Sequence, residues 1–142
     1  MMTPYKKILL VVDLSGDSQI IGERAKAMAG GAEITLLHVV EYVPVEPMGE
    51  ALLPTVQIES ELVGRARTKL ADLARQLGLE ASQQLVETGS IKAEIIRTAQ
   101  RLACDLIVLG SRERHGLAIL LNFTEDTILH AAPCDVLAVR LH

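Results

Sequence analysis

The chain has 142 residues, of which 49% are hydrophobic, and a formal net charge of −4. This length suits a single domain over residues 1–142, with one core that buries roughly 70% of the surface of the unfolded chain. The acidic balance argues against nucleic acid or an anionic membrane surface as a partner, and no apolar run reaches the ~20 residues of a membrane span. We therefore expect a soluble, cytoplasmic protein.

The first forty residues predict two buried strands with a helix between them. Lys7 to Val12 is a continuous apolar run typical of a central parallel strand, and it ends at Asp13. Ile34 to Val40 is a second run of this kind. The intervening helix stops at Gly30-Gly31, and its predicted apolar face consists of Ile20, Ile21, Ala25 and Met28. Asp13 is then expected at the carboxyl end of a strand, where ligands of open α/β sheets bind.

The middle of the chain predicts a long loop followed by a long helix. Three prolines interrupt the segment from Glu41 to Gln57, which we interpret as a loop that is either mobile or held only by a partner subunit. Helical spacing then extends from Ile58 to Leu77, and Gly78 supplies the stop. The apolar positions of this helix are Ile58, Leu62, Ala66, Leu70, Leu73 and Leu77.

The remaining strands and helices alternate. Leu79 to Val86 is a polar, weakly alternating strand suited to a sheet edge, and Gly89-Ser90 opens a helix with Ile91, Ile95, Ala99 and Leu102 on its apolar face. Asp105 to Leu109 and Val136 to Val139 are apolar strands that flank a loop and an apolar helix, which makes a βαβ unit. The sequence thus predicts an α/β fold with an open, mostly parallel five-stranded sheet covered by helices on both faces.

Two cysteines each precede one of the last two strands. Neighbouring strands lie about 4.8 Å apart, so Cys104 and Cys134 come within reach of a disulfide if their two Cys-Asp pairs are in register. The alternative, which we adopt, is a pair of reduced core thiols, because no adjacent basic residue lowers either pKa for a redox role. Their spacing is not that of metal ligands, and we expect no metal.

No pattern of catalytic residues is evident. His38 lies within an apolar strand, which favours a hydrogen-bonded structural histidine, and His130 near a helix C-terminus suits the helix dipole. The spacing Gly-x-Ser-x-Gly surrounds neither Ser15 nor Ser111, so an assembly of Asp13, Ser15 and His38 into a triad lacks its nucleophile turn. We expect that the protein is not an enzyme.

Three stretches carry a family resemblance: Lys7 to Ser15, Leu36 to Val40 and Ala103 to Val139. Together they resemble the universal stress protein family, in the manner of its cytoplasmic bacterial members. The resemblance implies a Rossmann-like sheet with the strand order 3-2-1-4-5. It also implies a homodimer through the last strand, Val136 to Val139, which as an edge strand would otherwise expose unpaired backbone groups.

The nucleotide-binding branch of that family carries three glycines, the last followed by Ser or Thr. Gly110 fills the first position and Thr124 the last, but Glu113 and Phe123 stand where the other two glycines are expected. By resemblance, a weak or vestigial nucleotide site comprises Asp13, Val39, Gly110, Ser111, Arg112 and Thr124.

Two interpretations of that site stay open. At ~5 Å and an effective dielectric of about 20, the Glu113 carboxylate opposes each phosphate charge by about 3 kcal/mol. Side chains in place of glycines also restrict the approach of backbone N–H groups to phosphate. We therefore predict a dimeric stress protein that acts through protein contacts without a cofactor. The alternative is an ATP-binding or AMP-binding regulator that turns Glu113 to solvent.

Overall fold

The computed structural model describes residues 5–41, 52–112 and 131–141. In chain order its elements are β1 (Lys7–Val11), α1 (Ser18–Ala29), β2 (Glu33–Val40), α2 (Leu52–Gln76), β3 (Gln84–Thr88), α3 (Ile91–Arg101), β4 (Leu106–Arg112) and β5 (Asp135–Leu141).

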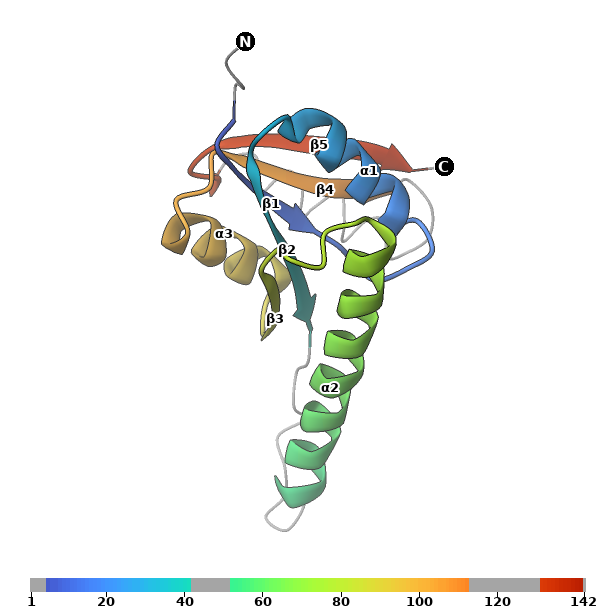
Figure 1. The fold of residues 1–142 in the computed structure, drawn as a ribbon. Coiled ribbons are helices and arrows are strands. Elements are labelled where there is room, and N and C mark those ends of the chain that lie inside the picture. The colour runs from blue at the N-terminus through green and yellow to red at the C-terminus, as the bar shows by residue number, and fades with distance from the viewer. Residues whose placement is uncertain (1–4, 42–51, 113–130, 142) are drawn as a thin grey trace.

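The five strands form one parallel sheet in the order β3-β2-β1-β4-β5 (Figure 1). This confirms the predicted fold class and the strand order that the family resemblance implied. The weakly apolar β3 and the final strand β5 occupy the two edges, as predicted. The buried strand β1 lies at the centre, which agrees with its continuous apolar sequence.

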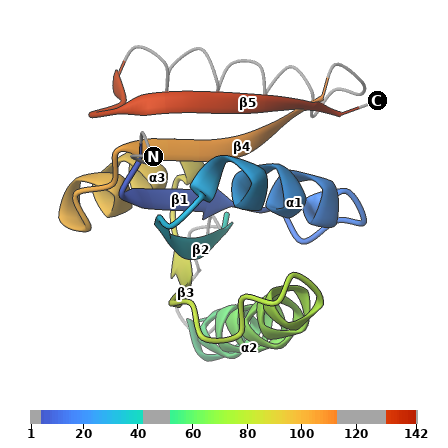
Figure 2. The same cartoon turned by 45° about the horizontal axis from the view of Figure 1, so that its top comes forward.

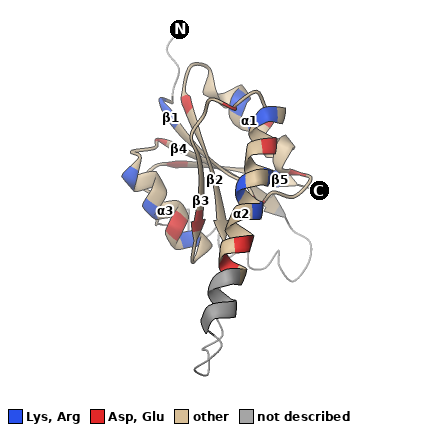
Figure 3. Cartoon of the chain, turned by 60° about the horizontal axis from the view of Figure 1, so that its bottom comes forward, with Lys and Arg blue, Asp and Glu red and all other residues tan. Residues whose placement is uncertain are grey.

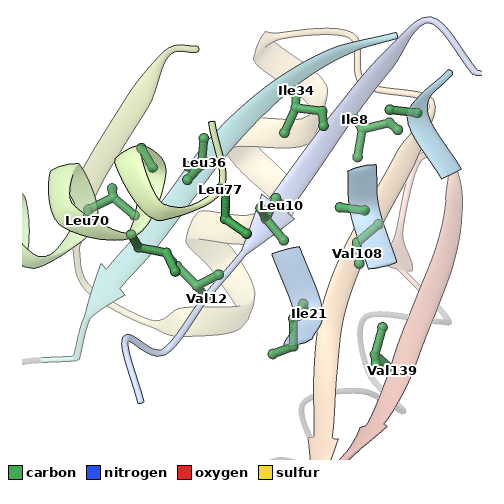
Figure 4. Close-up of a cluster of buried hydrophobic side chains, with 14 of the residues drawn as sticks. Ile8, Leu10, Val12, Ile21, Ile34, Leu36, Leu70, Leu77, Val108 and Val139 are labelled. Atoms are coloured by element: carbon green, nitrogen blue, oxygen red, sulfur yellow. The ribbon is translucent and has the colours of Figure 1, made fainter. Parts of the chain in front are cut away.

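Helices cover the sheet in layers, with α1 and α2 on one face and α3 on the other (Figure 2). The larger core lies under α1 and α2 and is built from aliphatic side chains such as Leu10, Ile21, Leu70 and Val108 (Figure 4). Under α3, a smaller core joins Ile95 and Ala99 to side chains of β1, β2 and β4. The apolar face predicted for this helix is confirmed, with Ile91 and Leu102 packing at its margin.

The predicted apolar face of α1 is wrong at two positions. Ile20 is 52% exposed and Met28 is 36% exposed, whereas Ile21, Ala25 and Ala29 are buried. The buried residues recur every four positions and so share one helix face, whereas Ile20 and Met28 each precede a member of that series by one residue and so point about 100° away from it. Gly30, with φ +58°, ends the helix as predicted.

Helix α2 begins at Leu52, so the prediction of a loop from Glu41 to Gln57 is wrong for its last six residues. Pro54 is the third residue of the helix. A proline is tolerated there because the first four N–H groups of a helix make no intrahelical hydrogen bond, so the missing N–H of proline removes none. Residues 42–51 of the predicted loop lie outside the described residues. None of the described helices combines the length and the apolar character needed to cross a membrane.

Several strand boundaries also differ from the prediction, and β5 extends beyond the predicted Val136 to Val139 at both ends. Residues Leu79 to Gln83 form the turn after α2, in which the Leu79 N–H donates to the Ala74 carbonyl at 2.7 Å, and β3 starts only at Gln84. Strand β4 continues beyond Leu109 to Arg112, because Gly110, Ser111 and Arg112 pair with β5. The helix predicted between β4 and β5 lies mainly in residues 113–130, outside the described part of the chain.

Candidate functional site

The strand order reverses between β1 and β4, and such a switch point leaves a crevice at the carboxyl ends of the strands. The pairing of β1 with β4 ends at Leu10 and Val108, whereas β4 continues along β5 as far as Arg112. The two central strands therefore separate at their carboxyl ends. This local divergence opens the sheet at the position where the sequence predicted a ligand.

A cavity of about 190 Å³ occupies this crevice. Its lining is mainly aliphatic and comes from four strands, two helices and the loop after β1: Val11, Val12, Asp13, Ile21, His38, Val39, Ile91, Ile95, Leu109, Gly110 and Leu141. Three of the predicted site residues, Asp13, Val39 and Gly110, are thus brought together. Among these lining residues, Asp13 and His38 carry the polar side chains.

Asp13 organises the loop between β1 and α1. Its Oδ1 accepts hydrogen bonds from the backbone N–H of Ser15 at 3.0 Å and from the Ser18 hydroxyl at 3.2 Å. Between them, Leu14 adopts φ +64°, an uncommon conformation for a residue with a branched side chain. Asp13 therefore has a structural role in this turn, and the same exposed carboxylate lies at the margin of the cavity.

His38 is held by the backbone. Its Nδ1 lies 2.8 Å from the carbonyl oxygen of Val12, and since a carbonyl only accepts, Nδ1 carries the proton that is donated. This fixes the ring of a half-buried histidine between β2 and the end of β1. The prediction of a hydrogen-bonded structural histidine is confirmed, although the residue also lines the cavity.

Gly110 is closely packed by two side chains. A Cβ atom at this position would lie 2.6 Å from Cδ1 of Ile21 and 2.9 Å from Cδ1 of Leu141. Two aliphatic side chains, one from α1 and one from β5, therefore converge on the backbone of Gly110 at the cavity wall. The φ angle of Gly110 is not in the positive range. The missing Cβ therefore allows side chains to approach the backbone closely, and no unusual backbone conformation requires a glycine here.

Of the other predicted site residues, Ser111 and Arg112 are not brought to the cavity lining. Ser111 belongs to β4 and pairs with Arg140, and Arg112 ends β4 opposite Leu141. The strand predicted to end at Leu109 extends to Arg112, so Arg112 belongs to β4 rather than to the loop that follows it. Thr124, Glu113 and Phe123 lie outside the described residues, as does His130.

Sequence reasoning missed much of the cavity lining. Ile91 and Ile95 were assigned only to the apolar face of α3, and Leu141 was left outside the last strand. The N-terminus of α3 is positioned by Ser90, whose Oγ accepts the N–H of Ala93 at 3.5 Å. The sequence did contain a signal for Ile91 and Ile95. The helix that carries them follows the carboxyl end of a strand, and in an open α/β sheet such a helix starts beside the crevice.

The two cysteines are free thiols. In the ladder Leu106 pairs with Asp135, so the two Cys-Asp pairs are offset by one residue and the in-register arrangement does not occur. Burial, and secondarily the neighbouring Cys134, raises the pKa of Cys104 to about 11, and burial likewise raises the pKa of Cys134. Among the described residues no cluster of His, Cys, Asp or Glu side chains could hold a metal ion.

The sequence profile of the universal stress protein family matches residues 4–140. The chain belongs to the universal stress protein family. Two relatives of this family come from Coxiella burnetii. Universal stress protein A homolog 1 is 39% identical over 138 residues, covering 95% of this chain and 96% of that one. Universal stress protein A homolog 2 is 35% identical over 144 residues, covering 99% of this chain and 98% of its own.

Solved universal stress proteins share the fold. The universal stress protein UspA from Lactobacillus plantarum has a TM-score of 0.80 at 23% identity, covering 96% of this chain and 98% of that chain. A universal stress protein in complex with cAMP has a TM-score of 0.59 at 16% identity, covering 95% of this chain and 96% of its own. At these identities the likeness concerns the fold.

Proposed function

We propose that this universal stress protein is a cytoplasmic, non-enzymatic, dimeric stress-response factor that acts through protein contacts and does not bind ATP tightly. The observation that carries the proposal is the convergence of Ile21 and Leu141 on Gly110. In a nucleotide-binding loop a glycine at this position leaves room for phosphate oxygens against the backbone. Here the ends of two aliphatic side chains lie close against that backbone, which reduces the room for phosphate.

The size and chemistry of the cavity support the same proposal. Its volume of about 190 Å³ is below the roughly 300 Å³ at which pockets for drug-sized ligands begin. The charged side chain at its margin is the Asp13 carboxylate, which repels phosphate. The lining therefore favours a small, uncharged group over a triphosphate.

The proposal that the protein is not an enzyme is supported by the hydrogen bonds of Asp13 and His38, the two polar residues that line the cavity. Asp13 Oδ1 is engaged by Ser15 and Ser18, and His38 Nδ1 donates to a backbone carbonyl. None of these three hydrogen bonds pairs a base with a nucleophile across the cavity. The raised thiol pKa values also leave both cysteines mainly protonated at neutral pH, where thiols are weak nucleophiles.

A nucleotide-binding regulator is the second candidate. It is favoured by the place of the cavity at the switch point and by the presence of Asp13, Val39 and Gly110 in its lining. A related universal stress protein has been solved in complex with cAMP. In this candidate, Ile21 and Leu141 must change rotamer to admit the phosphates of ATP.

Restoring the missing glycines separates the two candidates. ATP is titrated calorimetrically into the unmodified protein and into a variant with Glu113→Gly and Phe123→Gly, with circular dichroism to verify folding. If Asp13, Gly110, Ser111 and Thr124 form a surviving half-site, the variant should bind ATP at least tenfold more tightly, equal to about 1.4 kcal/mol. Micromolar binding by the unmodified protein would instead support the nucleotide regulator, and a folded variant with no gain would show that the glycines are not the cause.

We propose that the dimer forms through the exposed edge of β5. An open edge strand presents unpaired backbone groups, and two-fold pairing with a second copy covers them. Light scattering after size exclusion should give about twice 15.4 kDa. Ala138→Lys should yield a monomer by placing like charges across the edge, while Ala27→Lys on exposed α1 should remain dimeric. A monomer in the unmodified protein at every concentration would contradict the proposal.

A further inference from the structure

The two free cysteines lie at the amino ends of β4 and β5, which run side by side in the sheet (Figure 2). Leu106 pairs with Asp135 in the ladder. Cys134 is therefore level with Asp105, and Cys104 stands one residue earlier. A strand separation of about 4.8 Å and an offset of about 3.3 Å place the two Cα atoms about 5.8 Å apart. Disulfides have Cα separations of about 4.4–6.8 Å, so the offset keeps the pair within reach of a disulfide.

The end of α3 directs Cys104 into the core beneath that helix. Ala103 follows the helix and adopts φ +53°, in the left-handed region. Its N–H donates to the Gln100 carbonyl at 3.2 Å. The N–H of Cys104 donates to the Ala99 carbonyl at 2.9 Å. These are the two hydrogen bonds of a Schellman motif, in which the next side chain commonly packs back onto the helix. The Cys104 side chain accordingly belongs to the core between α3 and the sheet.

Cys134 packs against the same core from the start of β5. Cys104 is 7% exposed, whereas Cys134 is half-buried. After burial, Cys134 is the strongest of the influences that raise the pKa of Cys104 to about 11, ahead of the Asp105 carboxylate. Electrostatic effects weaken with distance, so the two sulfur atoms are close neighbours.

We propose that Cys104 and Cys134 form a modification site, at which a hydroperoxide converts the two thiols into an intramolecular disulfide between the starts of β4 and β5. Cys134 reacts first, because it is the more accessible of the two. Its thiolate attacks one oxygen of the hydroperoxide and the O–O bond breaks, which makes Cys134 a sulfenic acid. The leaving alkoxide or hydroxide takes up the proton that the Cys134 thiol released.

The second step closes the disulfide. The sulfur of Cys104 attacks the sulfur of Cys134, the S–O bond breaks, and the hydroxyl leaves as water with the proton of the Cys104 thiol. Two thiols and one hydroperoxide thus give one disulfide, one water, and one alcohol or second water.

The charges around the pair make this reaction slow at neutral pH. Most basic residues of the described chain lie on the helices (Figure 3). Beside the thiols are two carboxylates, and after burial Asp135 and Asp105 raise the pKa of Cys134 further. A small thiolate fraction slows the attack on the oxidant. The pair therefore responds to sustained rather than brief exposure to a hydroperoxide.

Peroxide treatment of the folded protein tests the site. The reduced protein is treated with hydrogen peroxide at about pH 8, where more thiolate is present. Remaining thiols are then blocked with iodoacetamide, and the chain is digested for mass spectrometry without reductant. We expect a peptide pair joined through Cys104 and Cys134, from a chain of monomer mass. Cys104→Ser should stop at a Cys134 sulfenic acid, which dimedone traps. Cys134→Ser should oxidise at least tenfold more slowly, because its remaining thiol is buried.

An equilibrium measurement tests the geometry in the unmodified chain. In mixtures of reduced and oxidised glutathione, the folded chain should form the disulfide with an equilibrium constant at least tenfold larger than in urea, because the fold holds the sulfur atoms together. A control with Cys134→Ser and Met28→Cys keeps two thiols but places the second on α1, on the other face of the sheet. It should form no intramolecular disulfide while folded.

Three results would overturn the proposal. The first is that no link between Cys104 and Cys134 forms in the folded protein under either treatment. The second is that the main product of oxidation joins two chains. The third is an equilibrium constant in the folded chain no larger than that in urea, which would show that the fold holds the sulfur atoms apart.

Discussion

The carboxylate of Asp105 accepts the backbone N–H of Lys7 through Oδ1 at 3.0 Å, while its Oδ2 accepts the N–H of Lys6 at 2.9 Å. The N–H of Asp105 in turn donates to the carbonyl of Lys7 at 2.9 Å. One residue, at the start of β4, therefore fixes the beginning of the central strand β1. This gives the second member of the Cys104-Asp105 pair a structural role that the sequence did not reveal.

The first prediction concerns removal of this carboxylate. Asp105→Ala should lower the free energy of unfolding by about 1–2 kcal/mol, because two N–H groups lose a charged acceptor that is partly screened by solvent. Asp135→Ala should cost less, since Asp135 accepts only from the exposed Tyr5 hydroxyl among the bonds seen here, at 2.9 Å. Urea unfolding at pH 7 compares the two. Equal losses would contradict the assignment.

The same contact predicts a pH dependence. Desolvation raises the pKa of Asp105, but the hydrogen bonds from Lys6 and Lys7 outweigh it, and the net pKa lies below its ordinary value of 3.8. A lowered folded-state pKa stabilises the fold at every pH above the unfolded value, and the stabilisation disappears as pH falls through the folded value. The loss caused by Asp105→Ala should therefore be full at pH 7 and shrink below pH 3.8. A loss that stays constant down to pH 2 would exclude an ionic contribution.

Much of the fold follows from the sequence because its signals are local. Continuous apolar runs identify β1 and β2, and Ser90 and Gly30 mark helix ends by capping chemistry. The start of α2 was missed because a proline was taken as a helix breaker, although a first-turn proline costs no hydrogen bond. The weak alternation after Gly78 likewise did not distinguish a turn from the start of β3.

The site was less predictable, because it depends on contacts between residues far apart in the sequence. Asp13, Val39 and Gly110 were identified by family resemblance, and the cavity includes all three. The packing of Ile21 and Leu141 onto Gly110 joins α1, β4 and β5, and spacing along the chain does not encode it. A glycine retained from a binding motif and a glycine retained for packing look the same in a single sequence.

A third prediction tests why Gly110 is a glycine. Gly110→Ala should destabilise the protein by about 1–3 kcal/mol, because the new Cβ overlaps Cδ1 of Ile21 and of Leu141. Ile21→Val removes one of those atoms and by itself should cost about 0.5–1.5 kcal/mol. In a double-mutant cycle the two changes should cost less together than the sum of their separate effects. Strict additivity would show that Ile21 does not limit this position.

A fourth prediction compares two helical glycines. A Cβ at Gly22 would lie 2.3 Å from Cδ1 of Leu77, whereas a Cβ at Gly64 has no neighbour within 4 Å. Gly22→Ala should therefore cost about 1–2 kcal/mol through overpacking between α1 and α2. Gly64→Ala should stabilise the protein by about 0.5–1 kcal/mol through helix propensity alone. Thermal unfolding of both variants checks the contrast, and a shift of the same sign in both would contradict it.

The cysteines give a prediction about reactivity. Because burial raises the pKa of Cys104 to about 11, its thiolate fraction at pH 7 is very small. Alkylation by iodoacetamide, followed by mass spectrometry, should be slow in the folded protein and should accelerate about tenfold per pH unit up to pH 9. In urea both thiols should react at the rate of an exposed cysteine. Rapid, pH-independent modification of Cys104 in the folded state would show that burial does not control this thiol.

The central claim is that this universal stress protein works without tightly bound ATP, since the side chains of Ile21 and Leu141 lie close against the backbone of Gly110. Isothermal titration of ATP into the unmodified, gently purified protein tests it most directly, after mass spectrometry has verified that no nucleotide was retained. The account predicts no saturable binding tighter than about 1 mM, which corresponds to about −4 kcal/mol. A dissociation constant in the micromolar range, or nucleotide retained through purification, would contradict it.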